Sequence, residues 1–108
     1  MNLNKEIKDY IKEHAISELP HECCGILIEK NSKLKAIKCE NVSYNKREFF
    51  EISSLDYLSA LKVGEIRGYY HSHADNNTEL SSRDKQISII NDLPLIMYSV
   101  KSNEFKIC

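Results

Sequence analysis

The sequence has 108 residues, of which 42% are hydrophobic and 29% are charged, as is usual for one globular domain, here over residues 1–108. Fifteen basic and sixteen acidic side chains leave a net charge of −1, and no run of like charge suggests a nucleic-acid partner. No apolar run could span a bilayer and the charged N-terminus is unlike a signal peptide, so we expect no membrane contact and a cytoplasmic location.

The first part of the chain predicts a helix followed by a β-hairpin. Apolar residues recur at helical spacing across residues 3–19, and Pro20 then ends the pattern. The segment CCGILIE (23–29) is short and almost wholly apolar, which is typical of a buried strand. A turn separates it from a second strand over residues 34–39, so these two strands should form a hairpin.

The middle of the chain predicts a third strand and a short helix. The segment EFFEI (48–52) has the composition of a strand. Ser53, with Asp56 three residues later, is a helix-start pattern, and Gly64 marks the end of that helix. We expect its three spaced leucines to face the core: Leu55, Leu58 and Leu61.

The last part of the chain predicts a strand over residues 66–73, a helix over 82–91, and strands over 95–100 and 105–108. Helices and strands are therefore mixed, and several neighbouring strands are joined as hairpins. This pattern indicates an α+β domain, with a mainly antiparallel mixed sheet and about three helices.

The four cysteines predict no metal or redox site, because no two of them form a CxxC pair. They are expected to be small core residues in a reducing compartment. Cys23 and Cys24 are consecutive in a predicted strand, so their side chains should point to opposite faces of the sheet.

The segment YYHSHADNNTELSSRDK (69–85) contains the residues that suggest chemistry. His71 and His73 are two positions apart on a strand, so both face the same side. Asp84 falls in the first turn of the next helix, where the helix dipole favours a carboxylate. Two imidazoles and one carboxylate that leave a fourth position for water are the ligand set of a catalytic zinc site.

Each half of this pattern also has a simpler interpretation. Two histidines on one strand face can be a solvated polar face, and H-x-H alone favours that interpretation. Ser81 and Asp84 also match a capping pattern, in which each side chain bonds the other residue's backbone. The combination of all the elements at one corner of the fold is what favours a metal site.

A metal-bound water needs a base, and Glu22 is the best candidate in the sequence. It opens the apolar strand in LPHECCGILIE, where partial burial would raise its pKa towards that of a general base. The alternative interpretation is an exposed glutamate at the edge of a strand.

The chain resembles the JAMM metallopeptidases, also called the MPN, Mov34 or JAB family. Their signature is an upstream glutamate, then H-x-H, seven residues and S-x-x-D, and this sequence has every element in that order: Glu22, His71, His73, Ser81 and Asp84. The similarity covers essentially the whole chain. It is greatest to the N-terminal domain of phage tail assembly proteins of the K type, and next to small prokaryotic JAMM hydrolases.

The resemblance implies a JAMM/MPN (cytidine-deaminase-like) fold and a zinc hydrolase that cleaves peptide or isopeptide bonds. His71, His73 and Asp84 would bind one Zn²⁺, Glu22 would be the general base, and the Ser81 hydroxyl would help stabilise the oxyanion. The substrate would be a protein or peptide, either a ubiquitin-like tail or a phage tail component. In the second case the protein would be associated with the virion.

The sequence departs from the family pattern in one loop, and other functions stay open. Ala74 stands where the family usually has proline, and no proline directly precedes Ser81, which affects the loop path and the substrate preference it encodes. A non-catalytic structural module of a phage tail with the same fold is the main alternative. A non-haem iron site also uses two histidines and a carboxylate, whereas a zinc deaminase needs H-x-E and P-C-x-x-C, which are absent.

Overall fold

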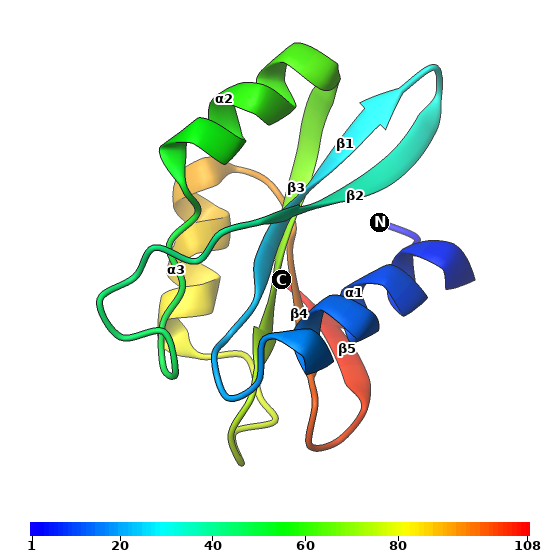
Figure 1. The fold of residues 1–108 in the computed structure, drawn as a ribbon. Coiled ribbons are helices and arrows are strands. Elements are labelled where there is room, and N and C mark those ends of the chain that lie inside the picture. Colours follow the sequence, from blue (N-terminus) through cyan, green and yellow to red (C-terminus); the bar gives the residue numbers. More distant parts are fainter.

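A five-stranded sheet in the order β2-β1-β3-β4-β5 lies at the centre of the structure, a computed structural model that describes residues 1–108 (Figure 1). In chain order the elements are α1 (Lys5–Ser17), β1 (Cys24–Lys30), β2 (Lys33–Cys39), α2 (Ser54–Val63), β3 (Glu65–His73), α3 (Ser82–Asn91), β4 (Leu95–Ser99) and β5 (Glu104–Ile107). All strand pairs are antiparallel except β3 with β4, which is parallel. The predicted α+β class with three helices and a mixed sheet is confirmed. None of the helices combines the length and apolar character needed to span a membrane.

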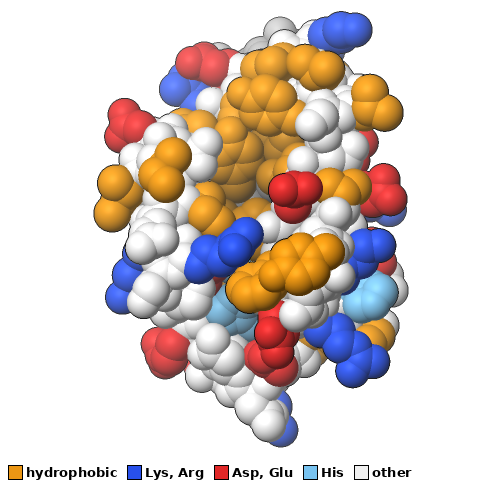
Figure 2. All heavy atoms as spheres, turned by 90° about the vertical axis from the view of Figure 1, so that its left-hand side faces the viewer, with side chains coloured by type: hydrophobic (Ala, Val, Ile, Leu, Met, Phe, Trp, Pro, Cys, Tyr) orange, Lys and Arg blue, Asp and Glu red, His pale blue; other side chains and the backbone are white.

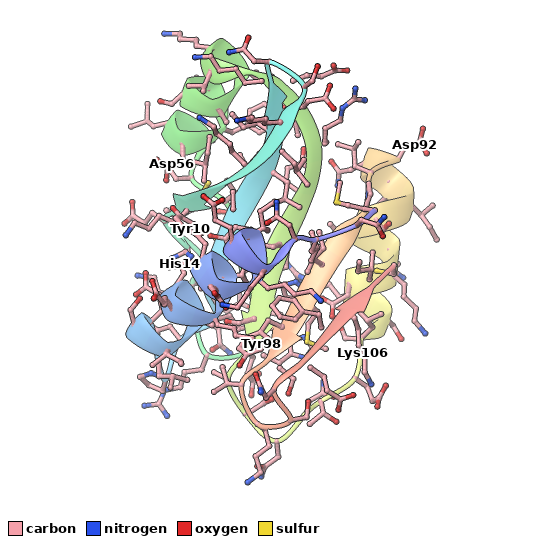
Figure 3. The ribbon with its side chains drawn as sticks, turned by 90° about the vertical axis from the view of Figure 1, so that its right-hand side faces the viewer. Tyr10, His14, Asp56, Asp92, Tyr98 and Lys106 are labelled. Atoms are coloured by element: carbon pink, nitrogen blue, oxygen red, sulfur yellow. The ribbon has the colours of Figure 1, made fainter.

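The helices form a layer on each side of the sheet, with α1 on one face and α2 and α3 on the other (Figure 1). The α1 side buries apolar residues from α1, β1, β3 and β4, including Ile7, Leu27 and Tyr70. Figure 3 shows α1 against the sheet, and His14 of this helix shares a hydrogen bond of 2.7 Å with the Tyr70 hydroxyl. The two apolar clusters, one on each face, hold the central strands β1 and β3 in place.

Strand β1 separates these two clusters, as the alternation of its side chains predicted. Cys23 belongs to the cluster under α1, while Cys24 belongs to the cluster under α2 and α3. All four cysteines are free thiols, and none is part of the cluster of potential metal ligands described below. Burial raises the pKa of the Cys23 thiol to about 12, so this residue is an inert core thiol.

The predicted strand over residues 48–52 is wrong. This segment has a single isolated bridge, between Asn41 and Ile52, with a hydrogen bond from Val42 N–H to the Glu51 carbonyl on one side of it. Phe49 N–H instead bonds the Asn45 carbonyl, so the segment starts inside a turn and has too few paired residues to form a strand.

The predicted inward orientation of the α2 leucines is also wrong. Ala60 is the only buried residue of this helix, and its small side chain allows the helix to lie close to the sheet. The exposed fractions of the leucines are 77% for Leu55, 53% for Leu58 and 49% for Leu61. Because α2 carries apolar residues on more than one side, the spacing of these residues along the helix does not identify the side that faces the sheet. Gly64 ends the helix as predicted.

Candidate metal centre

The end of β3 and the start of α3 bring His71, His73 and Asp84 together. Both histidines lie on the same side of β3, and all three side chains are buried. Nε2 of His71 lies 3.0 Å from Oδ1 of Asp84, and Nε2 of His73 lies 3.2 Å from Oδ2. The three residues therefore offer two nitrogens and a carboxylate to one point, as a shared metal ion requires.

Hydrogen bonds on the far side of each imidazole determine which nitrogen is available. Nδ1 of His71 is 3.1 Å from the Ile96 carbonyl, and Nδ1 of His73 is 3.2 Å from the Asn77 carbonyl. A carbonyl oxygen only accepts, so each Nδ1 must carry the proton, and in the neutral rings each Nε2 presents a lone pair. These are the tautomers that metal-binding histidines adopt when a carbonyl orients them.

The buried Nε2 of His71 supports this interpretation further. Although it lies 3.0 Å from the Asp84 carboxylate, it has no hydrogen-bond partner. A buried nitrogen and a buried carboxylate held this close without a hydrogen bond suit a cation that both of them contact. We therefore find that the residues present fit a bound metal ion.

A capping box at the start of α3 orients Asp84. The Ser81 hydroxyl accepts a hydrogen bond of 3.0 Å from the Asp84 N–H, and Oδ2 of Asp84 accepts one of 2.9 Å from the Ser81 N–H. The same carboxylate thus caps the helix and faces both histidines. The two interpretations of S-x-x-D are compatible, because capping aims the carboxylate at the cluster.

The electrostatics of the cluster favour an ionised Asp84. Burial alone would raise its pKa, but the adjacent His71 and His73 rings and the hydrogen bond from the Ser81 N–H outweigh burial, so its pKa lies well below its usual range. Burial alone would lower the pKa of His73, yet Asp84 outweighs this effect, and the net result is a raised pKa. The carboxylate is therefore negative at neutral pH, as a metal ligand must be.

Glu22 lies two positions before β1 and is buried in the wall of a pocket beside the cluster. The pocket has a volume of about 230 Å³, and its wall also contains His73, Ser81 and Asp84. Burial raises the pKa of Glu22 to about 8, and no group donates a hydrogen bond to its carboxylate. The alternative of an exposed strand-edge glutamate is therefore wrong. A buried carboxylate with a raised pKa holds a proton readily, which is the property of a general base.

Aromatic residues that the sequence did not single out form the neighbouring wall. Phe50 stacks on His71 with 4.6 Å between ring centroids, and the Arg83 guanidinium lies 4.7 Å from the centre of the Phe49 ring. The adjacent aromatics in EFFEI were assigned to a strand, and no sequence signal indicated that one of them packs on a histidine.

An apolar groove adjoins the pocket, and Phe50 lines both. The groove has a volume of about 390 Å³ and is lined by residues of the 50–58 segment together with β3 and α3, among them Ile52, Tyr57, Leu58 and Ile87. Figure 2 shows hydrophobic side chains gathered on this face, with acidic side chains below them. The metal cluster thus lies beside an apolar surface, at a place where acidic and basic side chains are mixed.

Comparison with known proteins indicates the family of this chain. Residues 4–104 match the family described as prokaryotic homologs of the JAB domain. The chain is 38% identical to tail tip assembly protein K of Escherichia phage N15 over 77 residues, which cover 71% of this chain and 32% of that protein. The chain thus spans about a third of the length of that curated relative.

Two solved structures share the fold at low sequence identity. A protein from Desulfitobacterium hafniense superposes with a TM-score of 0.73 at 22% identity, covering 96% of this chain and 78% of that one. A protein from Salinibacter ruber gives a TM-score of 0.62 at 20% identity, covering 99% of this chain and 80% of that one. With a family match over nearly its whole length and an α+β sheet of the expected form, the chain belongs to the prokaryotic homologs of the JAB domain.

Proposed function

We propose that this domain is a zinc-dependent hydrolase of peptide or isopeptide bonds. In this proposal His71, His73 and Asp84 hold the metal, Glu22 is the general base, and Ser81 stabilises the oxyanion. The observation that carries it is a cluster of two imidazole nitrogens and a carboxylate, of which His73 and Asp84 line one pocket together with Glu22, a second, buried carboxylate whose pKa is about 8. A purely structural metal site has no need for that second carboxylate.

In the proposed hydrolysis, the metal ligands, Glu22 and Ser81 have separate roles. A divalent ion held by His71, His73 and Asp84 would supply Lewis acidity, which would lower the pKa of a bound water and polarise a carbonyl group. Glu22 takes one proton from the attacking water and delivers it to the leaving nitrogen, so water is added across the C–N bond. The Ser81 hydroxyl accepts the Asp84 N–H, which leaves its own hydrogen free to donate to the developing oxyanion.

The donor set supports zinc as the metal. Two neutral imidazoles and one carboxylate are found in catalytic zinc sites, and non-haem iron(II) uses the same three donors. The family match favours a hydrolase over an oxygenase, because metallohydrolases carry the JAB fold. Elemental analysis separates the two metals directly.

The groove beside the pocket supports a polypeptide substrate. Its apolar walls could hold the side chains of a peptide, while Phe50 links them to the pocket that contains Glu22. The similarity to tail tip assembly protein K supports a phage tail component as substrate or partner, and an association with the virion or with its assembly in the cytoplasm. A ubiquitin-like tail is the alternative substrate. A tail module that binds metal without turnover is the alternative function.

The test is metal analysis by mass spectrometry on protein purified without added metal, together with a panel of peptide and isopeptide substrates. We expect about one zinc per chain and hydrolysis by the wild type. Glu22→Gln should keep the zinc and lose at least about 10²-fold in turnover. Glu51→Gln, which changes an exposed glutamate outside the pocket, is the matched control. Full zinc occupancy with no cleavage of any substrate would favour the structural module.

A further inference from the structure

We infer that Asn41 positions the base: its side-chain amide joins the backbone of Glu22 to the loop that forms the Phe49–Phe50 wall of the pocket. This inference rests on the proposed role of Glu22. Asn41 lies beyond β2, does not line the pocket and contributes no ligand to the metal cluster.

The carboxylate of Glu22 depends on its backbone for its position. No group donates a hydrogen bond to the carboxylate itself. The backbone, in contrast, is held at both ends of the residue. Its N–H donates to the Lys46 carbonyl at 2.7 Å, and its carbonyl accepts from Nδ2 of Asn41 at 2.9 Å. The next N–H, of Cys23, donates to the Ser72 hydroxyl at 2.8 Å, in the middle of the H-x-H segment.

Asn41 uses its full hydrogen-bonding capacity on backbone groups. Besides Glu22, Nδ2 donates to the Phe49 carbonyl at 3.0 Å. The oxygen Oδ1 accepts from the N–H of Ser43 at 3.0 Å and from the N–H of Glu51 at 3.2 Å. An asparagine amide has two donor hydrogens and two acceptor lone pairs, so all four are occupied. A side chain that only stabilised a local turn would need no bond to Glu22, which is 19 positions away in the sequence.

Apart from the Glu22–Lys46 bond and the packing of Phe50 on His71, the loop that carries Lys46 has few contacts that hold it in place. Its regular structure is one bridge, between Asn41 and Ile52. The other side-chain bonds inside the loop are a 3.2 Å bond from the Asn45 N–H to the Ser43 hydroxyl and an exposed 3.3 Å contact between Asn45 and Glu48. Asn41 therefore connects the base, the loop and the aromatic wall at one point, and its loss should move all three together.

Asn41→Asp separates the bonds that Asn41 donates to Glu22 and Phe49 from the bonds that it accepts within the local turn. The variant keeps an oxygen for the N–H groups of Ser43 and Glu51, so the local turn can persist. Its second oxygen faces the carbonyls of Glu22 and Phe49, where no donor is left and like partial charges repel. Asn41→Ala removes all four bonds. Asn45→Ala, which loses only the exposed contact to Glu48, is the matched control.

The first measurement needs no substrate, and it uses hydrogen exchange of individual amides in the folded, zinc-loaded protein. In Asn41→Asp we expect the Glu22 N–H to exchange at least about tenfold faster, with the β1 amides unchanged. Unchanged exchange at Glu22 would overturn the inference, as would a uniform acceleration through β1, which would indicate a global stability role. If Asn41→Asp does not fold, Asn41→Ala is measured in the same way.

The second measurement uses the peptide that the wild type cleaves fastest. Asn41→Asp should lower kcat by about 10–100-fold with KM and zinc content nearly unchanged, because a displaced base affects the chemical step more than binding. An unchanged kcat would overturn the inference. If Glu22→Gln cleaves as fast as the wild type, the proposed function fails instead. In that case faster exchange at Glu22 would still establish that Asn41 holds this residue.

Discussion

Glu22 and Asp84 are two carboxylates in one pocket whose surroundings move their pKa values in opposite directions. Burial dominates at Glu22 and raises its pKa to about 8, whereas the two histidines lower the pKa of Asp84 far enough to overcome burial. Pairs of acids with separated pKa values are a general sign of divided roles in catalysis. This separation supports a metal ligand at Asp84 and a proton carrier at Glu22.

The raised pKa of Glu22 predicts how the metal-free protein responds to pH. Glu22 titrates near 4.5 when unfolded and near 8 when folded, so the folded state binds more protons between these values. Stability should therefore fall as pH rises from 4.5 to 8, with a contribution on the order of 3–4 kcal/mol from this residue. This contribution is measured by urea unfolding of chelator-treated wild type and Glu22→Gln across this pH range.

The Glu22→Gln variant should lack this contribution, so its stability should exceed that of the wild type most clearly near pH 8. Glu51→Gln, in which an exposed carboxylate is replaced, is the control and should follow the wild-type curve. If the free energy of unfolding depended on pH in the same way for wild type and Glu22→Gln, this would contradict a buried Glu22 carboxyl with a raised pKa.

Removal of single side chains from the cluster should release the metal. His71→Ala, His73→Ala and Asp84→Asn each leave two of three ligands, which is too few for a stable site. Metal should also leave the wild type as pH falls through the histidine range, near about 5–6, because a protonated imidazole cannot coordinate. Elemental analysis after dialysis tests both expectations. His21→Ala, which replaces an exposed histidine beside Glu22, is the control and should keep its metal. Full metal occupancy in both His71→Ala and His73→Ala would rule out this site.

At the scale of elements, the N-terminus of α3 matters more for the site than the N-terminus of α2. Ser81 caps α3 through a hydrogen bond to the Asp84 N–H, whereas Ser53, at the equivalent position of α2, makes no capping bond with its side chain. Asp56 in α2 instead accepts the Glu40 N–H at 2.7 Å. Two similar S-x-x-D patterns therefore have different structures, because only one of them forms a reciprocal box.

The two serines give a paired prediction. Ser81→Ala should lower the free energy of unfolding by about 1 kcal/mol, within the 0.5–2 kcal/mol range of lost N-caps, and should slow hydrolysis. Ser81→Thr keeps a hydroxyl and should restore most of the stability. Ser53→Ala should cost much less, since no bond is lost. Equal losses for Ser81→Ala and Ser53→Ala in urea unfolding would contradict the assigned cap.

At the scale of the whole molecule, the site depends on close packing between the α1 layer and the central strands. Gly25 of β1 lies against the ring of Tyr70 on β3, and Tyr70 reaches through its hydroxyl to His14 on α1. A Cβ atom at Gly25 would lie 2.0 Å from the Tyr70 ring, which is far inside contact distance. Tyr70 directly precedes His71, so the packing of the α1 face also sets the position of a ligand.

Gly25→Ala should therefore destabilise the fold by about 1–3 kcal/mol, as expected for overpacking in a closed core. Urea unfolding of zinc-loaded protein is the measurement. Because Tyr70 must move, zinc affinity should fall as well. Ala60→Gly, which opens space under α2 on the opposite face, is a control for stability loss without effect on Tyr70. Wild-type stability in Gly25→Ala would show that the ring moves without cost.

The local sequence predicted most elements well, and the errors lie where local pattern and tertiary contact disagree. The periodicity of residues 3–19, the apolar run at 23–29 and the caps of α3 depend on neighbours in the chain, and each became the expected element. The 48–52 segment has strand composition but only one bridging partner, and the α2 leucines have helical spacing but face solvent. Strand pairing and the choice of a buried helix face both depend on distant residues.

The sequence by itself determined the α+β class, the same-side placement of His71 and His73, and Asp84 in the first turn of a helix. These follow from the fixed geometry of strands and helix starts. Only the tertiary structure decided that Glu22 is buried in the same pocket, that Phe50 covers His71, and that Asn41 holds the Glu22 backbone. Each of these contacts joins segments separated by more than 15 positions, and spacing along the chain does not encode which distant groups meet across a folded core.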